Sequence, residues 1–340
     1  MKKIVIILFL LQFAKLARAQ DVHFSQFYSS PLTINPANTG LFNGFYRVGA
    51  NYKRQWASIP VPYQTFSAWG DMSFKRSDRN SFGKSALGLC VVQDQAGDGR
   101  LSATKINLSA AVHIPLDYDH TQYISAGLQA SYVQRRIDFN QLYWGNQWDG
   151  TQFNTQLNNK EPYRQSSFGY FDAALGVDYL ASFRDVLTVH GGFSIQHLVQ
   201  PKETFYNNDN HIGIKPALNA GGRYIINERN QLWTEVFFEE QKKANEFLIS
   251  GLWGYNAAED YNYFKSLIWF GLSMRWKDAI VPVLGYERNR MRILLNYDIN
   301  FSSLRVATQA RGGIEVSLIY MGENNTPPYR QPRIVPCPVF

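Results

Sequence analysis

Apolar and polar residues alternate along most of this chain. Between residues 105 and 114 one face carries Ile106, Leu108, Ala110, Val112 and Ile114, and the other carries Lys105, Asn107, Ser109, Ala111 and His113. The same alternation runs through residues 46–53, 124–132 and 291–300. A period of two residues is that of a β-strand with one apolar and one polar face. The pattern therefore predicts an all-β protein.

Fourteen segments show this pattern. They lie near residues 44–56, 63–75, 85–94, 100–114, 121–135, 167–180, 186–197, 216–227, 230–240, 245–255, 265–276, 279–287, 291–300 and 312–320. Several reach about ten residues or more, whereas strands of soluble proteins most often have about five or six and bilayer-crossing strands about 9–11. We therefore predict a transmembrane outer-membrane β-barrel of about fourteen antiparallel strands over residues 44–320. A soluble sandwich or jelly roll, with shorter strands, is the alternative.

The lengths of the connections agree with an even strand count. An even count places both ends of the chain in the periplasm. The long connections at 136–166, 198–215 and 301–311 then all fall on the extracellular side, where outer-membrane barrels carry their long loops. Residues 256–264 are a longer connection on the periplasmic side, and we expect a misplaced strand boundary there.

Acidic residues within the strands are expected to face the lumen. Asp172, Asp178 and Glu315 lie on the non-apolar face of their strands, whereas Glu235 lies on a mixed face. A charge facing lipid in mid-bilayer costs a barrel up to about 2–4 kcal/mol for a basic residue and less for an acidic one. The solvated face of a soluble sheet would give the same placement.

The first nineteen residues have the features of a secretory signal peptide. Lys2 and Lys3 precede an apolar run over residues 4–13, and Ala17-Arg18-Ala19 supplies small residues for cleavage. The run is too short to span a bilayer as a helix, which takes about 20 residues. We expect cleavage after Ala19, with Gln20 as the first residue of the mature chain.

Charge and cysteine content exclude two further classes. The net charge of +7 includes four basic residues and no acidic residue in the signal peptide, which leaves +3 on the mature chain. That is not the charge of a nucleic-acid-binding protein. The two cysteines, Cys90 and Cys337, allow one disulfide in an exported protein but do not form a disulfide scaffold. The sequence leaves their pairing open.

No constellation of residues indicates an enzyme. The six histidines lack metal-ligand spacing, and motifs of hydrolases and phosphate-binding loops are missing from the sequence. His190 and Ser194 share a polar face, but about 13 Å separates two such positions on a strand. We interpret both as polar lumen residues and His197 as a strand-end residue ahead of Pro201. No catalytic residue, metal site or cofactor is therefore predicted.

The two ends of the mature chain do not follow the alternating pattern. We predict an irregular periplasmic segment at residues 20–43 and a Pro-rich periplasmic tail at 321–340. The aromatic residues of the first segment need a surface, which is either the lumen of the barrel or another protein. The candidate partner-binding residues are Phe24, Ser25, Gln26, Phe27, Tyr28, Pro31, Asn35, Pro36, Pro338 and Phe340.

An ordered set of motifs resembles a known family. "FSQFYSSPLTINPANTG", "GGFSIQHLVQP", "GLSMRWKDAIVPVLGYE", "LLNYDINFSSL", "GGIEVSLIY" and the terminal "CPVF" occur in that order. The set is similar to the PorP/SprF family, outer-membrane proteins of the type IX secretion system of Bacteroidota. The family usually ends in Cys-Pro-Arg-Phe, and Val339 stands here in place of the arginine.

The resemblance implies a non-enzymatic barrel of the secretion and gliding apparatus. Such proteins organise the apparatus or act as dedicated partners for a secreted adhesin-like surface protein. The implied partners are outer-membrane lipid, a periplasmic lipoprotein or ring, and a secreted cargo. A porin-like channel for small solutes is the alternative function, and a barrel hydrolase is a more remote one.

Overall fold

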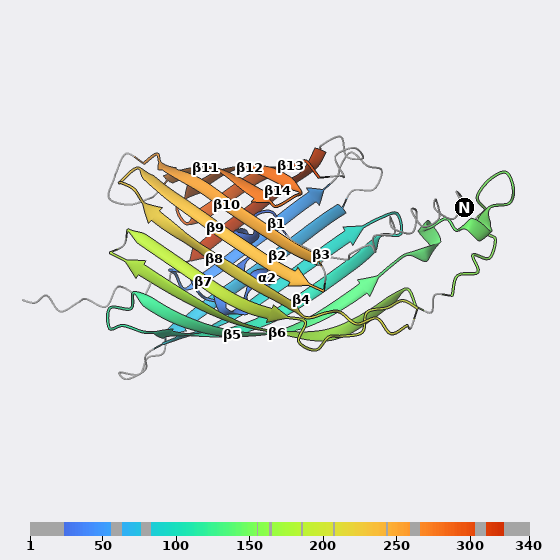
Figure 1. Cartoon of the computed structure of the whole chain (residues 1–340), viewed down its shortest axis with the longest axis horizontal. Coiled ribbons are helices and arrows are strands. Elements are labelled where there is room, and N and C mark those ends of the chain that lie inside the picture. Colours follow the sequence, from blue (N-terminus) through green and yellow to red (C-terminus); the bar gives the residue numbers. More distant parts are fainter. Residues whose placement is uncertain are drawn as a thin grey trace, which may run out of the picture.

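The chain forms a closed antiparallel barrel in which each strand pairs with its neighbours in sequence and β1 closes against β14 (Figure 1). The structure is a computed structural model, which describes residues 24–55, 63–75, 83–154, 156–162, 165–184, 186–206, 208–242, 244–258, 266–302 and 311–322. Its strands are β1 (Tyr46–Gln55), β2 (Tyr63–Lys75), β3 (Lys84–Ala96), β4 (Leu101–Pro115), β5 (Gln122–Arg136), β6 (Ser167–Phe183), β7 (Leu187–Gln196), β8 (Lys215–Ile225), β9 (Asn230–Gln241), β10 (Ala244–Asn256), β11 (Ser266–Arg275), β12 (Ala279–Arg288), β13 (Met291–Asn300) and β14 (Arg311–Gly322).

The fourteen predicted strands are confirmed, with ends that differ by at most three residues. The largest difference is in β6, which continues to Phe183. The boundary error expected near residues 256–264 is wrong, because β10 ends at Asn256 and β11 begins at Ser266. The two strands that flank this connection therefore end within one residue of their predicted positions.

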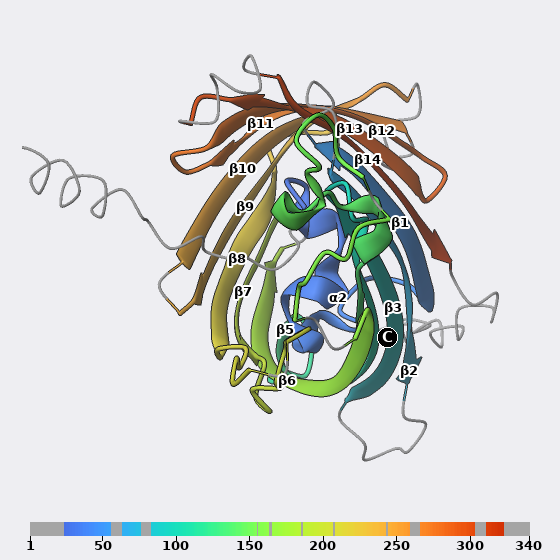
Figure 2. The same ribbon diagram turned by 90° about the vertical axis from the view of Figure 1, so that its right-hand side faces the viewer.

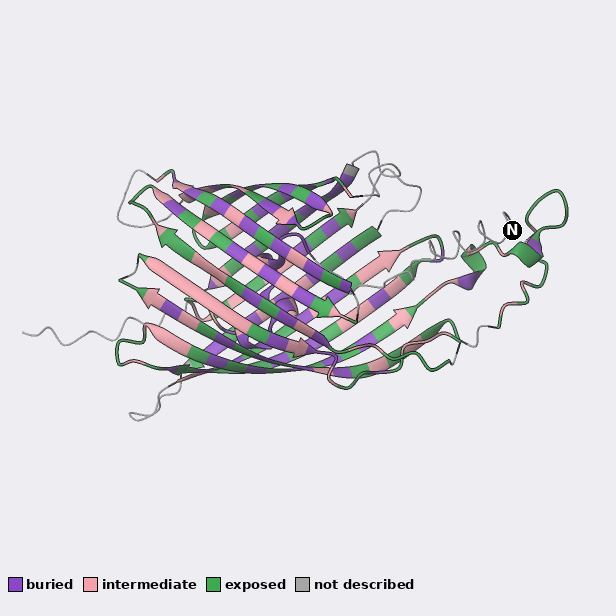
Figure 3. Ribbon diagram, in the orientation of Figure 1, coloured by how far each residue is buried: buried purple, intermediate pink, exposed green. Residues whose placement is uncertain are grey.

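Burial alternates along the strands as the pattern predicted (Figure 3). Leu108 is 60% exposed on the outer face, whereas its neighbours Asn107 and Ser109 are buried in the lumen. The acidic residues Asp172, Asp178, Glu235 and Glu315 are all buried, so Glu235 also faces inward. In the part of the chain that the structure describes, no helix is long and apolar enough to span a membrane.

The connections alternate between the two ends of the barrel because successive strands are antiparallel. Residues 137–166 and 197–214 lie at one end, and the shorter turns 116–121 and 226–229 lie at the other. Bacterial barrels place long loops outside the cell and short turns in the periplasm. We therefore call the first end the surface-side mouth and the second the periplasmic mouth.

Residues 24–40 lie inside the barrel, where they form a plug (Figure 2). The plug consists of three short helical turns, η1 (Phe27–Ser29), α2 (Pro31–Ile34) and η2 (Pro36–Asn38), followed by the residues that lead into β1. Pro31 and Pro36 each stand at the start of a turn, where the missing N–H of proline costs no hydrogen bond. Of the two surfaces left open for its aromatic residues, the lumen of the barrel is the one that Phe24, Phe27 and Tyr28 contact.

Candidate functional site

The plug crosses the lumen from one mouth toward the other. Ser25 contacts Lys53 and Glu315, which lie near the surface-side ends of β1 and β14. Gly40 contacts Asp71, which lies near the periplasmic end of β2. The described segment therefore begins near the surface-side mouth and reaches the periplasmic mouth only where it joins β1. An even number of strands fixes the ends of the wall but not the course of a segment inside it.

A buried ionic cluster holds the surface-side end of the plug. Glu315 accepts the backbone N–H groups of Ser25 and Gln26 at 2.8 and 2.9 Å. The hydroxyl of Ser25 donates to Asp298 at 3.0 Å, and Arg275 donates to both that hydroxyl and Asp298. The nitrogen of Lys53 lies 3.7 Å from Asp298 and 3.9 Å from Glu315. Charged groups from four strands thus surround one turn of the plug.

Aromatic contacts fix the next turn. The ring of Phe27 stacks on Phe237 with 5.5 Å between centroids, and Tyr28 meets Trp233 edge-on at 4.8 Å. Phe27 belongs to a buried cluster that also includes Ile34 and Leu248. Burial of a large apolar side chain stabilises a protein by about 1.5–3 kcal/mol. The plug therefore shares an apolar core with β8, β9 and β10.

Polar side chains of the wall satisfy the backbone of the helical turns. Gln129 donates to the carbonyl oxygen of Leu32 at 3.0 Å, and Ser194 donates to that of Ile34 at 2.8 Å. The amide of Asn35 donates to the carbonyl oxygen of Val177 at 3.0 Å. A buried backbone group without a partner is costly, so these inward-facing polar residues make an irregular segment compatible with the lumen.

Glycines let the plug touch the backbone of the wall. A Cβ added to Gly127 would collide with the backbone of Pro36, and one added to Gly176 would collide with the side chain of Asn35. Both glycines occupy inward positions on β5 and β6. At each position the plug thus occupies the space that a larger side chain would fill.

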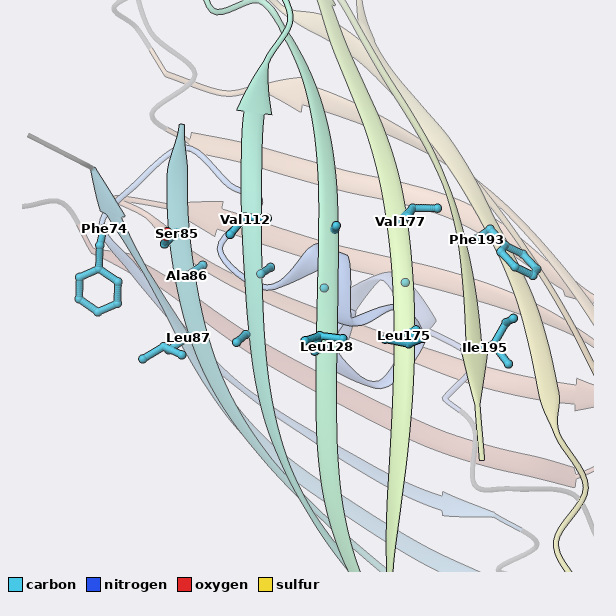
Figure 4. A pocket seen from close by; sticks show the side chains of 15 residues that line it. Phe74, Ser85, Ala86, Leu87, Val112, Leu128, Leu175, Val177, Phe193 and Ile195 are labelled. Atoms are coloured by element: carbon cyan, nitrogen blue, oxygen red, sulfur yellow. The ribbon is translucent and has the colours of Figure 1, made fainter. Parts of the chain in front are cut away.

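The outer face of the same region carries a groove of about 760 Å³ (Figure 4). Small residues on β3, β4 and β5 line it together with larger apolar residues such as Leu128, Leu175 and Phe193. Figure 4 shows Leu128 and Leu175 on adjacent strands across the groove. Its lining contains no charged residue, as suits the lipid-facing surface of a barrel.

The periplasmic end of the plug is also anchored. The N–H of Gly40 donates to Asp71 at 2.7 Å, and the guanidinium of Arg47 donates to both oxygens of that carboxylate. His113 donates through Nε2 to the carbonyl oxygen of Thr39 at 2.8 Å. A cavity of about 190 Å³ lies beside this end and is lined in part by Tyr28, Trp69, Arg47 and Arg292.

The structure brings the first eight predicted partner-binding residues together in the plug. Phe24, Ser25, Gln26, Phe27, Pro31, Asn35 and Pro36 are buried, Tyr28 is partly buried, and the barrel wall supplies their contacts. Pro338 and Phe340, and with them the predicted tail at 321–340 beyond Gly322, lie outside the described residues. Whether any of these residues also binds a partner stays a prediction.

Sequence reasoning missed the residues of the wall that hold the plug. Glu315 was expected to face the lumen. The contacts that the plug makes with Glu315, Asp71, His113 and Gly127 were not foreseen. An acidic residue and several glycines on the inner face of long strands are the only signal in the sequence. That signal is compatible with a filled lumen, and the N-terminal segment was one candidate to fill it, but the individual contacts could not be read from the sequence.

The residues considered for catalysis have structural partners. His190 donates to Glu235 at 3.0 Å, whereas Ser194 bonds the plug, which confirms that they are separate polar lumen residues. His197 follows β7 and lies 2.5 Å from Asp172. Among the described residues, no group of His, Cys, Asp and Glu could hold a metal ion. Cys90 is buried in the lumen and Cys337 lies outside the described residues, so their pairing is untested.

Comparison with known proteins gives a family and a fold. The family model described as type IX secretion system membrane protein PorP/SprF matches residues 16–320. No curated protein matches the sequence. The ΔS2S3 mutant of TodX, a monoaromatic hydrocarbon channel, is 9% identical with a TM-score of 0.50, over 85% of this chain and 92% of that chain. Omp33 of Acinetobacter baumannii is 9% identical with a TM-score of 0.40, over 82% and 98%. At such identities the likeness to the TodX mutant is one of fold.

Proposed function

Because this chain belongs to the PorP/SprF family of type IX secretion system membrane proteins, we propose that it is a non-enzymatic outer-membrane component of the secretion and gliding machinery. In this role it organises the apparatus or acts as the dedicated partner for export or surface attachment of a secreted adhesin-like protein. Its partners are then a periplasmic lipoprotein or ring on one side and the secreted protein on the other. The function is one of binding, and no chemistry is assigned to it.

The plug is the observation that carries this proposal. Residues 24–40 pass through the lumen and contact the wall along their length by aromatic rings and by hydrogen bonds, several of them to charged side chains of the wall. A barrel filled in this way is suited to hold other proteins at its two mouths rather than to conduct solutes. In this proposal the predicted partner-binding residues from Phe24 to Pro36 fill the lumen and hold the wall, and the partners bind at the two mouths.

Deletion of the gene tests the proposed role. We expect a specific secreted surface protein to remain inside the cell while uptake of small antibiotics across the outer membrane is unchanged. Normal surface display together with normal spreading would contradict the proposal. Reintroduction of the full-length gene must restore display, which excludes an effect on neighbouring genes.

A channel for small solutes is the second candidate function. The TodX mutant, described as a monoaromatic hydrocarbon channel, has the same type of fold, but fold does not determine function. Planar bilayers distinguish the two functions. The secretion role predicts no conductance from the purified protein, and a channel predicts steady conductance. A variant with residues 25–39 replaced by a Gly/Ser linker is the positive control, because an emptied barrel of this size is expected to conduct.

A further inference from the structure

A structured loop projects from the surface-side mouth. Residues 137–154, which we call the projecting loop, follow β5 and extend beyond the rim of the barrel (Figure 1). The N–H of Asp138 donates to the carbonyl oxygen of Gly99 in the β3–β4 turn at 2.7 Å. Phe139 is buried and meets Phe205, from the connection between β7 and β8, edge-on with 6.1 Å between ring centroids. Two other connections at this mouth thus hold the base of the projecting loop.

Hydrogen bonds within the projecting loop hold the part that lies farther from the rim. The side-chain oxygen of the buried Gln147 accepts the N–H of Trp144 at 3.1 Å. The carboxylate of Asp149 accepts the N–H groups of Thr151 and Gln152 at 2.8 and 2.9 Å, which closes a tight turn. A surface that is ordered before it binds a partner loses less conformational entropy on binding. The projecting loop is therefore preorganised to present its side chains.

Three aromatic side chains are exposed on this loop. Tyr143, Trp148 and Phe153 are 67, 50 and 48% exposed. The ring of Phe153 lies between the other two, with centroids 5.6 Å from that of Tyr143 and 5.1 Å from that of Trp148. Contiguous exposed apolar groups, unlike apolar residues scattered singly, mark sites of interaction. We call these three residues the aromatic cluster.

The stretch that carries the aromatic cluster is almost free of charge. Asp149 is the only charged residue between residues 139 and 154, and its carboxylate is engaged in the turn. The centre of a protein–protein interface is likewise depleted of charged residues and enriched in aromatic ones. An anionic partner such as a phosphorylated lipid headgroup would require basic residues, and this stretch contains none. The composition therefore fits an uncharged surface of a partner.

The tilt of the rings favours a polypeptide over a neutral glycan. The ring of Phe153 is inclined by 49° to that of Tyr143 and by 66° to that of Trp148. A sugar ring stacks flat on an aromatic face, and rings tilted in this way share no plane for successive sugars. The notch between tilted rings instead suits single apolar side chains. The exposed amide of Gln152, next to Phe153 in the chain, can both donate to and accept from a peptide backbone.

We propose that the aromatic cluster is the docking site for the secreted polypeptide at the surface-side mouth, and that it receives a segment with apolar side chains and few charges. This inference rests on the proposed function, which places the secreted protein on this side of the barrel. A few aromatic residues often supply most of the binding energy of such a contact. Trp148 and Tyr143 are the two residue types most enriched at such positions.

Photocrosslinking in living cells tests the contact. The photoreactive amino acid p-benzoylphenylalanine takes the place of Trp148, and adducts of the barrel are identified by mass spectrometry. We expect an adduct with the secreted protein that the gene-deletion strain retains. The same amino acid in place of Trp276, which is 56% exposed in the β11–β12 turn at the same mouth, is the control and is expected to give no such adduct. An adduct with polysaccharide or lipid alone, or no adduct from a folded barrel, would overturn the docking site.

Removal of the aromatic cluster tests its importance. In a variant with Tyr143→Ser, Trp148→Ser and Phe153→Ser we expect surface display of the same secreted protein to fall by about tenfold or more, because the centre of the contact is lost. Trp276→Ser is the matched control and keeps display, and electrophoretic mobility shows that both barrels are folded. Unchanged display in the triple variant, when deletion of the gene abolishes display, would overturn the docking site and leave the proposed function standing. Unchanged display in the deletion strain would overturn both.

Discussion

The carboxylate of Glu315 accepts the backbone N–H of Ser25 at 2.8 Å, which joins the last strand of the barrel to the beginning of the plug. The other carboxylate oxygen accepts the N–H of Gln26. These two residues are separated by most of the chain, yet their contact is buried. The plug is therefore held by the strand that closes the barrel.

Glu315→Ala is expected to destabilise the barrel. Two buried N–H groups lose their acceptor and Lys53 loses one of its two carboxylates, so we expect the free energy of unfolding in detergent to fall by on the order of 3 kcal/mol. The measurement is thermal unfolding, followed by the change in electrophoretic mobility of the barrel. Glu240→Ala, at an exposed position near the end of β9, is the matched control. Equal unfolding temperatures of the two variants would contradict the anchoring role.

Phe27→Ala is expected to remove the apolar core of the plug. Truncation of a buried phenylalanine costs about 3–5 kcal/mol, and here the stacking on Phe237 is lost as well. Phe171→Ala is the control, because Phe171 is 74% exposed on the outer face. Thermal unfolding of both variants in the same detergent measures the difference. A docking segment that is not part of the fold would instead lose its partner and leave the barrel as stable as before.

Gly127→Val is expected to push the plug away from the wall. The added side chain would occupy the place of the Pro36 backbone, and overpacking of this kind costs about 1–3 kcal/mol. Ala126→Val, one residue earlier and on the outer face, adds similar volume where lipid can yield. Conductance in planar bilayers is the readout, and only Gly127→Val is expected to show transient openings. A silent Gly127→Val variant of normal stability would contradict the tight contact.

The reactivity of Cys90 reports whether the plug is packed against the wall. Its side chain is 0% exposed and belongs to a buried cluster with Leu32 and Trp69. In a Cys337→Ser background we expect Cys90 to resist maleimide in the folded barrel. Leu32→Ala should make it reactive, because this substitution opens the contact between plug and wall. Fast reaction of Cys90 without any substitution in the plug would show that the segment leaves the lumen readily.

The wall of the barrel was predictable from the sequence because the pattern that specifies each strand lies within the strand itself. Each strand places one face in lipid and one in the lumen, so the alternation at residues 105–114 indicates a strand, and strand lengths of about ten residues or more indicate a membrane barrel. The plug has no such period. Its turns are stabilised by residues such as Gln129, Ser194 and Glu315, which lie far away in sequence. Only the folded barrel brings these partners together, and the aromatic residues alone left two surfaces possible.

The passage of the plug through the lumen constrains how this protein is assembled. β1 pairs with β14 to complete the wall, and the chain just ahead of β1 is already enclosed by it. Either residues 24–40 are drawn through a finished ring, or the ring is completed around them. The second order requires no threading of the plug past the buried ionic cluster. Insertion would then end with the seam between β1 and β14, and the plug would be enclosed by the closure of its own barrel.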